Sequence, residues 1–186
     1  MKTIIFLTGN VRKLNEAKKI IGNEVDVNIL NKKIDLDEIQ STNVKDIIEK
    51  KIVDAYKKIN KPVFCEDTGL YIKNLNNFPG ALIKFYYEYV GNKKITKFSG
   101  GSKAYAETII GYTEDGKKTS FYSGIVRGTI SKKPKGKKGF GWDPIFIPNN
   151  SNKTFAEMDG EEKNNISMRY KAFKKFKKFL NKKYKK

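Results

Sequence analysis

The segment Thr8-Gly9-Asn10-Val11-Arg12-Lys13 joins an apolar run, residues 3–7, to a helical pattern that begins immediately after it. The first N–H groups of a helix have no partner inside the helix, and together with the positive end of the helix dipole they attract anions. Gly9 lets the backbone approach an anion, Asn10 is a residue type that caps helices, and Lys13 lies one turn in. This pattern is typical of a phosphate site, although an ordinary strand-to-helix turn with a solvated lysine has the same composition.

A second group of chemically capable residues is Glu66-Asp67-Thr68-Gly69, which follows the short apolar run Val63-Phe64-Cys65. The run predicts a strand, and sheets of α/β proteins place ligand-binding residues where strands end. Carboxylates near a phosphate site suit a divalent ion that bridges protein and polyphosphate. A capped turn is the structural alternative.

A third group, Phe140-Gly141-Trp142-Asp143-Pro144, combines aromatic faces with a permissive glycine and a carboxylate. Such a segment can stack on a flat base while a polar group contacts the base edge. The alternative is an aromatic loop that fills the core. Lys163, Ser167 and Arg169 are expected near the start of the last helix, either within reach of a base or phosphate or simply solvated.

The chain contains no histidine and one cysteine, Cys65. Histidine metal sites and Ser-His or Cys-His nucleophile systems are therefore excluded. One cysteine also excludes an internal disulfide and offers no cysteine-based metal site, and we expect Cys65 to be a buried strand residue. The chemistry must use carboxylates, lysines, hydroxyls and backbone groups.

The formal charge of +19 raises the question of nucleic-acid binding. However, the only arginines are Arg12, Arg127 and Arg169, whereas readout of base edges usually relies on arginine. The lysines are spread along the chain, so we interpret most of the charge as solvated surface whose positive field speeds the arrival of polyanionic substrates. Nucleic acid is not the expected partner.

Periodicity predicts one α/β domain, residues 1–186, in which these groups are held by alternating strands and helices. The expected strands are residues 3–7, 25–29, 63–65, 105–112 and 120–127, the last two forming a hairpin. The expected helices are residues 11–21, 44–59, 83–90 and 161–184. No apolar run is long enough to cross a bilayer, and the N-terminus turns polar too early for a secretory signal, so a cytoplasmic protein without membrane contact is expected.

Taken together, the motifs resemble the inosine triphosphate pyrophosphatase family, and the resemblance runs nearly end to end. The segments that carry it occur in the family's order: TGNVRK (8–13), IDLDEIQ (34–40), EDTGL (66–70), FPGALIKF (78–85), FGWDPIF (140–146), TFAEM (154–158) and EEKNNISMR (161–169). The resemblance implies hydrolysis of noncanonical purine nucleoside triphosphates (ITP, dITP, XTP) to monophosphate and pyrophosphate. It also implies a mixed α/β fold with a long central β-sheet, two lobes with the nucleotide cleft between them, and a homodimer.

Roles for individual residues follow from the same resemblance. The triphosphate would be held by Thr8, Gly9, Asn10, Lys13, Lys84 and Lys51, the adjacent Lys50 fitting nearly as well as Lys51. Glu38 and Asp67 would bind Mg²⁺, for which Mn²⁺ is a possible substitute, and Asp67 is also the candidate for activating the attacking water. Thr68 would touch the nucleotide.

The base pocket is implied in the same way. Phe140 would stack on the base, Gly141, Trp142 and Asp143 would shape the pocket, and Lys163, Ser167, Met168 and Arg169 would complete it. Met168 departs from the family, which usually has histidine there. A histidine can hydrogen-bond to a purine edge and a thioether cannot do so usefully, so base selectivity is in question more than hydrolysis. On this hypothesis, Met168→His sharpens the preference for ITP over GTP.

Two alternatives stay open at this point. One is a basic nucleic-acid-binding protein on a pyrophosphatase scaffold, and the other is a pyrophosphatase of other modified nucleotides, such as altered pyrimidines. Salt-sensitive binding to nucleic acid without pyrophosphate release would indicate the first.

Overall fold

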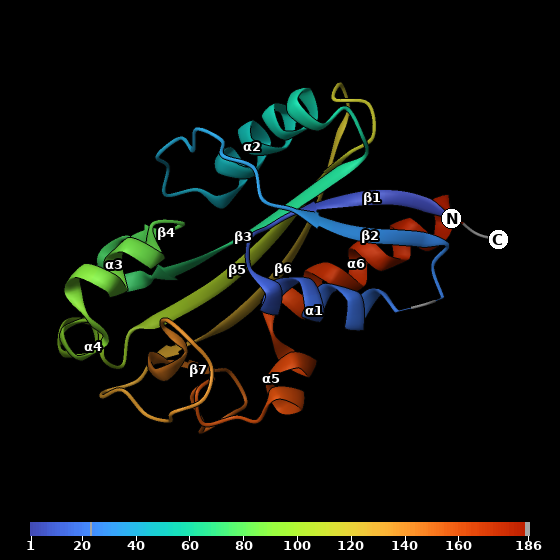
Figure 1. The fold of residues 1–186 in the computed structure, drawn as a ribbon. Coiled ribbons are helices and arrows are strands. Elements are labelled where there is room, and N and C mark those ends of the chain that lie inside the picture. The colour runs from blue at the N-terminus through green and yellow to red at the C-terminus, as the bar shows by residue number, and fades with distance from the viewer. Residues whose placement is uncertain (23, 185–186) are drawn as a thin grey trace.

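A seven-stranded sheet with helices on both faces forms the framework of residues 1–22 and 24–184, the part of the chain that the computed structural model describes (Figure 1). Its strands are β1 Lys2–Leu7, β2 Val27–Lys32, β3 Val63–Ile72, β4 Pro79–Gly80, β5 Lys103–Thr113, β6 Thr119–Ile130 and β7 Phe146–Pro148. Its α-helices are α1 Val11–Ile21, α2 Val44–Ile59, α3 Ile83–Val90, α4 Asn92–Ser99, α5 Gly160–Ile166 and α6 Met168–Lys183.

The sheet is mixed and its centre is long. The strand order is β2-β1-β3-β5-β6-β7, with β4 paired to β3 off this path. Strand β1 is parallel to β2 and β3, whereas all other pairs are antiparallel. Helices α1, α2 and α6 cover one end of the long strands, and α3, α4 and α5 lie toward the other end (Figure 1). The expected mixed α/β fold with a long central sheet is confirmed.

Alternation along the strands divides the core between the two faces of the sheet. Ile4 and Phe6 pack in one cluster with α1 and α6, while Ile5 and Leu7 pack in another with α2. This follows from the geometry of a strand, in which successive side chains point to opposite faces. A third apolar cluster, which includes Phe146 and Phe155, fills the end near α3 and α4.

Most of the expected elements are confirmed. Helices α2 and α3 have the predicted bounds, and β5 and β6 form the predicted antiparallel hairpin. Cys65 is buried, and burial raises the pKa of its thiol to about 12, which keeps it protonated. Helix α4 is not expected from the sequence, because Ile95 is its only buried apolar residue. In the described residues, no helix is long and apolar enough to span a membrane.

The strand expected at residues 63–65 is wrong in length, because β3 continues to Ile72. Residues 66–69 therefore lie within a strand and not at its end. Their polar side chains hide the strand pattern, but pairing with β5 holds them extended, with Asp67 opposite Ile109. Because β1 pairs with β3 only at Val63 and Phe64, residues 66–69 still lie just beyond the end of the parallel pairing.

The single helix expected at residues 161–184 is also wrong. Ser167 has φ −63° and ψ 152°, an extended conformation that separates α5 from α6. Its hydroxyl accepts a hydrogen bond from the backbone N–H of Tyr170 at 3.1 Å and so caps α6. The apolar stripe continues at helical spacing across this break, which is why periodicity does not reveal it.

Phe173 tests the core beneath α1 and α6. Its ring is fully buried, and its centroid lies 6.2 Å from those of Phe6 and Phe64, edge-on to both. We expect Phe173→Ala to lower the free energy of unfolding by about 3–5 kcal/mol, because it removes buried surface and leaves a cavity. Urea unfolding measures this, with Phe98→Ala as the control, since the Phe98 side chain is 63% exposed. Equal losses in the two variants would contradict this description of the core.

Candidate active site

The start of helix α1 is fixed by side-chain capping. The Asn10 side chain accepts hydrogen bonds from the backbone N–H groups of Arg12 and Lys13, at 3.0 and 3.3 Å. The N–H of Asn10 in turn donates to the hydroxyl of Thr8 at 3.1 Å. The predicted cap is confirmed, and it holds residues 8–10 at the carboxyl end of β1.

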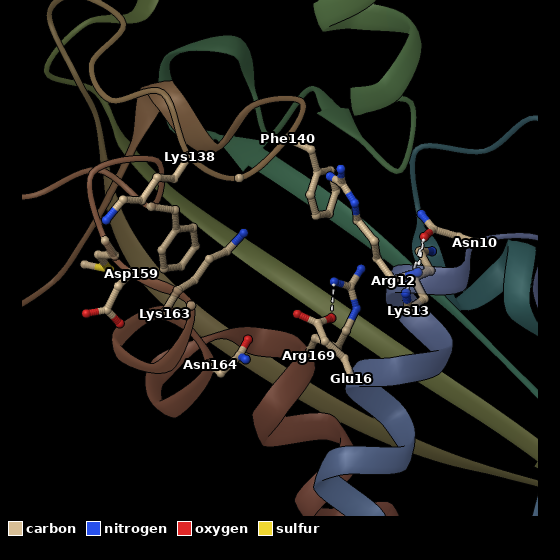
Figure 2. Close-up of a pocket in the computed structure, with 14 residues that line it drawn as sticks. Asn10, Arg12, Lys13, Glu16, Lys138, Phe140, Asp159, Lys163, Asn164 and Arg169 are labelled. Atoms are coloured by element: carbon tan, nitrogen blue, oxygen red, sulfur yellow. Dashed lines mark hydrogen bonds and ion pairs between the residues drawn. The ribbon is translucent and has the colours of Figure 1, made fainter.

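A buried carboxylate, Glu66, joins three distant segments of the chain. Its Oε1 lies 2.7 Å from Nζ of Lys13, and its Oε2 lies 3.3 Å from Nε of Arg169. Arg169 also pairs with Glu16, Nη1 to Oε2, at 2.9 Å (Figure 2). Burial would raise the pKa of Glu66, but the charges of Arg169 and Lys13 outweigh it and lower the pKa to about 2. Glu66 is therefore ionised and paired at neutral pH.

The sequence analysis missed Glu16, and it singled out Glu66 as a carboxylate suited to a divalent ion but not as the partner of Lys13 and Arg169. Lys13 and Glu16 are three residues apart on α1 and so share one face of the helix, a signal that could have placed Glu16 near the site. Glu66 adjoins Asp67, but alternation along β3 sends their side chains to opposite faces of the sheet. The partners of Glu66 come from α1 and α6, and that association is not readable from local sequence.

Asp67 lies on the other face. One of its oxygens accepts a hydrogen bond from the backbone N–H of Thr68 at 2.8 Å, and the Thr68 hydroxyl lies 2.7 Å from that of Thr108. Burial raises the pKa of Asp67, and the neighbouring Glu66 adds to this, although Lys13, Lys51 and the Thr68 N–H oppose it. A carboxylate with a raised pKa accepts a proton more readily than an ordinary aspartate.

A cavity of about 390 Å³ brings together Thr8, Gly9, Glu38 and Lys51. Asp67 does not line this cavity, but its charge acts on Lys51. The Lys51 ammonium forms an ion pair with Glu38. Burial would lower the pKa of Lys51, but Glu38 and then Asp67 raise it, so the lysine is charged. The adjacent Lys50 pairs with Asp54 on the surface of α2, so the structure places Lys51 and not Lys50 at this cavity.

On the opposite side of residues 8–10, a second cavity of about 210 Å³ opens between α1, α6 and the loop before Phe140 (Figure 2). The Phe140 side chain is 45% exposed there. The Lys163 ammonium lies 5.0 Å from the centroid of the Phe140 ring, and the Arg169 guanidinium lies 6.0 Å from it. Of the predicted residues, this cavity brings together Asn10, Lys13, Phe140, Lys163 and Arg169.

Asp143 holds two residues that line this cavity, Phe140 and Lys163. Its carboxylate is buried, pairs with Lys163 at 2.6 Å and accepts a hydrogen bond from the backbone N–H of Phe140 at 2.8 Å. Gly139 has φ +78°, and a Cβ there would lie 2.2 Å from the Asp143 carboxylate, so only glycine fits. Asp143 therefore fixes both the loop and Lys163.

Other predicted residues lie outside both cavities. Trp142 is buried in the core, edge-on to Phe146 with ring centroids 5.6 Å apart. Met168 belongs to the same apolar cluster, and Ser167 caps α6. Lys84 is exposed on α3. The roles proposed for these residues stay predictions, including the effect of Met168 on selectivity, which the relative kcat/KM of Met168→His would measure.

Comparison with known proteins gives the family. The model of the Ham1 family matches residues 4–179. The chain belongs to the Ham1 family. It is 39% identical to a dITP/XTP pyrophosphatase from Methanopyrus kandleri over 93% of each chain, and 37% identical to an inosine triphosphate pyrophosphatase from Kluyveromyces lactis over 95% of each. These matches confirm the resemblance that the motifs indicate.

The fold is also that of a Ham1 protein. The structure of a HAM1 protein from Coxiella burnetii is similar with a TM-score of 0.89 at 27% identity, covering 98% of this chain and 100% of that one. The mixed sheet described above is therefore the fold of this Ham1 relative.

In this member of the Ham1 family, Glu66→Gln tests the buried ion pairs. Removing the charge leaves Lys13 without its partner and buried Arg169 with Glu16 alone, and we expect the free energy of unfolding at pH 7 to fall by about 3–5 kcal/mol. The folded-state pKa of Glu66 is lowered from 4.5 to about 2, so its contribution is complete above pH 4.5 and is lost as pH falls toward 2. The difference from wild type should therefore shrink across that window.

Denaturant unfolding at several pH values makes this measurement. Glu24→Gln is the matched control, because Glu24 pairs with Lys177 but its side chain is 76% exposed, and it should hardly change stability. A similar, small effect of both substitutions would show that the Glu66 pairs do not stabilise the fold.

Proposed function

We propose that this protein hydrolyses noncanonical purine nucleoside triphosphates, namely ITP, dITP and XTP, to the monophosphate and pyrophosphate. The observation that carries the proposal is the pair of cavities on either side of residues 8–10, one with an aromatic ring and cations, the other with carboxylates and lysines. A nucleotide has the same two ends, a flat base and a charged triphosphate. The activities for which the two relatives are named, those of a dITP/XTP pyrophosphatase and an inosine triphosphate pyrophosphatase, support the substrate class.

The base end of the substrate is assigned to the cavity beside Phe140. The exposed Phe140 ring offers a stacking face, and Lys163 and Arg169 are donor-only groups near it. Donors favour a 6-keto oxygen and are left unpaired by the 6-amino group of adenine, which also donates. Discrimination against ATP follows from that mismatch.

The triphosphate end is assigned to residues 8–10 and the cavity beyond them. Thr8, Gly9 and Asn10 present backbone at the start of α1, Lys13 follows one turn into that helix, and Lys51 supplies positive charge within the cavity. Lys84, which is exposed on α3, is assigned a further contact with a phosphate on the strength of the family resemblance alone. These groups would orient the α-phosphorus for attack by water.

The residues near Lys51 fit a magnesium ion. Glu38 and Asp67 provide hard oxygen ligands, and Lys51 feels the charge of both carboxylates. Mg²⁺ is usually bound through one or two carboxylates and keeps waters and substrate phosphates as its other ligands. Bound there, Mg²⁺ (or Mn²⁺ in its place) would neutralise charge on the phosphates.

Asp67 is the proposed base. Its buried position raises its pKa, so its carboxylate would accept the proton of the attacking water as pyrophosphate leaves. Thr68 holds Asp67 in place through its backbone N–H and would itself touch the nucleotide.

A homodimer in the cytoplasm completes the proposal. Phe85 and Tyr89, one turn apart on α3, are 59% and 85% exposed, which supports burial of this helix face against a second copy.

Pyrophosphate release from ITP, XTP, dITP, GTP, ATP and dUTP tests the proposed function. We expect turnover of ITP, XTP and dITP to exceed that of ATP by roughly 10²-fold or more in kcat/KM, because the cavity beside Phe140 offers donors to keto oxygens. Turnover limited to dUTP would indicate a pyrophosphatase of modified pyrimidines. No release from any nucleotide, with salt-sensitive binding to nucleic acid, would overturn the proposal.

Asp67→Asn tests the proposed base. The substitution removes the proton acceptor, and we expect kcat for ITP to fall by about 10³-fold. Stability should be kept, since burial already disfavours the charged carboxylate there. Steady-state kinetics and thermal unfolding measure both effects, with Asp54→Asn on the outer face of α2 as the control. Near-normal turnover would remove Asp67 from the mechanism.

A further inference from the structure

Lys51 has an internal partner that an ordinary helix lysine lacks. It projects from α2 and pairs with Glu38, thirteen residues away in the connector that follows β2. Its side chain is only 19% exposed, whereas that of Glu38 is 57% exposed. The neighbouring Lys50 pairs, among the residues that the structure describes, with Asp54 one turn away on its own helix. Lys51 is therefore paired with a residue outside its own helix, whereas Lys50 is paired with a residue inside it.

Of the two carboxylates that suit a divalent ion, Glu38 is thus already paired with a cation. The Lys51 ammonium occupies an oxygen of Glu38 and lies within the field of Asp67. A divalent ion binding to Glu38 would have to displace this ammonium or remain close to it, with two like charges repelling each other.

We infer that Lys51 is an internal counter-ion that keeps Glu38 and Asp67 from holding a divalent cation until a polyphosphate draws the lysine away. The inference rests on the proposed function and deepens it, because it makes cation binding depend on the nucleotide. A phosphate oxygen in the cavity beside Thr8 and Gly9 offers the ammonium a new partner and releases Glu38.

The buried pair on the other face explains why this exchange is confined to Lys51. Lys13 is held by Glu66, whose side chain is fully buried and bound on its other oxygen by Arg169. Separating Lys13 from Glu66 would leave a buried charge short of a partner. Glu38 faces solvent, so its separation from Lys51 leaves a carboxylate that water or a cation can solvate.

The experiment measures the binding of two ligands, Mn²⁺ and pyrophosphate, separately in nucleotide-free protein. Mn²⁺ alone is titrated and followed by the electron paramagnetic resonance of the free ion, and pyrophosphate alone is titrated by calorimetry in EDTA. The proteins are wild type, Lys51→Gln and the matched control Lys50→Gln, together with Lys51→Arg and the double variant Glu38→Gln/Lys51→Gln.

We expect opposite changes for the two ligands in Lys51→Gln. Mn²⁺ affinity should rise by roughly tenfold or more as the repelling charge is removed, while pyrophosphate affinity should fall. Lys50→Gln and Lys51→Arg should resemble wild type in Mn²⁺ binding. The double variant Glu38→Gln/Lys51→Gln should not show the increase in Mn²⁺ affinity, which would show that the increase depends on Glu38.

Equal Mn²⁺ affinity in wild type and Lys51→Gln would overturn the inference. Weaker binding of both Mn²⁺ and pyrophosphate to Lys51→Gln would also overturn it, since that result is expected if Lys51 only supports the structure of the site. No step needs turnover, so a protein that hydrolyses none of the purine triphosphates yet shows the opposite changes would refute the proposed function while leaving the counter-ion in place.

Discussion

The buried carboxylate of Glu66 is the constraint on which the arrangement of the site depends. An ionised carboxylate without solvent is strongly unfavourable unless it is paired, so β3 must meet cations from elsewhere in the chain. Lys13 from α1 and Arg169 from α6 supply them, and Glu16 takes the remaining side of Arg169. Segments more than 150 residues apart in sequence are thereby fixed around one point, and the cavity beside Phe140 opens directly above it.

Successive side chains of β3 point to opposite faces of the sheet, and this divides the site into two parts. Glu66 faces α1 and α6, where the base is proposed to bind, and Asp67 faces α2, where the phosphate chemistry is proposed. Residues 8–10 pass between the two cavities. This arrangement requires β3 to continue beyond its pairing with β1. Residues 66–69 then stay extended because they pair with β5, while the edge of β3 that faces away from β5 is no longer paired with β1.

The sequence predicts those parts of the molecule that depend on local order. Helix α2 shows a clean apolar period, and Asn10 carries a capping side chain at a strand-to-helix junction, so both are predicted correctly. The continuation of β3 and the break at Ser167 are not, because pairing with β5 and a local cap override the periodic pattern. Similarly, nothing local distinguishes Phe140, which faces a cavity, from Trp142, which fills the core. That difference arises from how the loop after Gly139 packs on Asp143.

The charge of the site is arranged before any substrate arrives. Lys13, Lys163 and Lys51 are each held by a carboxylate, from Glu66, Asp143 and Glu38 respectively. Lys13 and Lys163, whose partners are buried, need little reorganisation when negative charge develops near them, which is the condition for strong electrostatic stabilisation. The carboxylates of Glu66 and Asp143 are buried, whereas that of Glu38 is mostly exposed, so only the Glu38 pair can open without leaving a charge unsolvated. The burial of the partner carboxylate therefore determines the role of each lysine: Lys13 and Lys163 are held in place, and Lys51 is able to exchange partners.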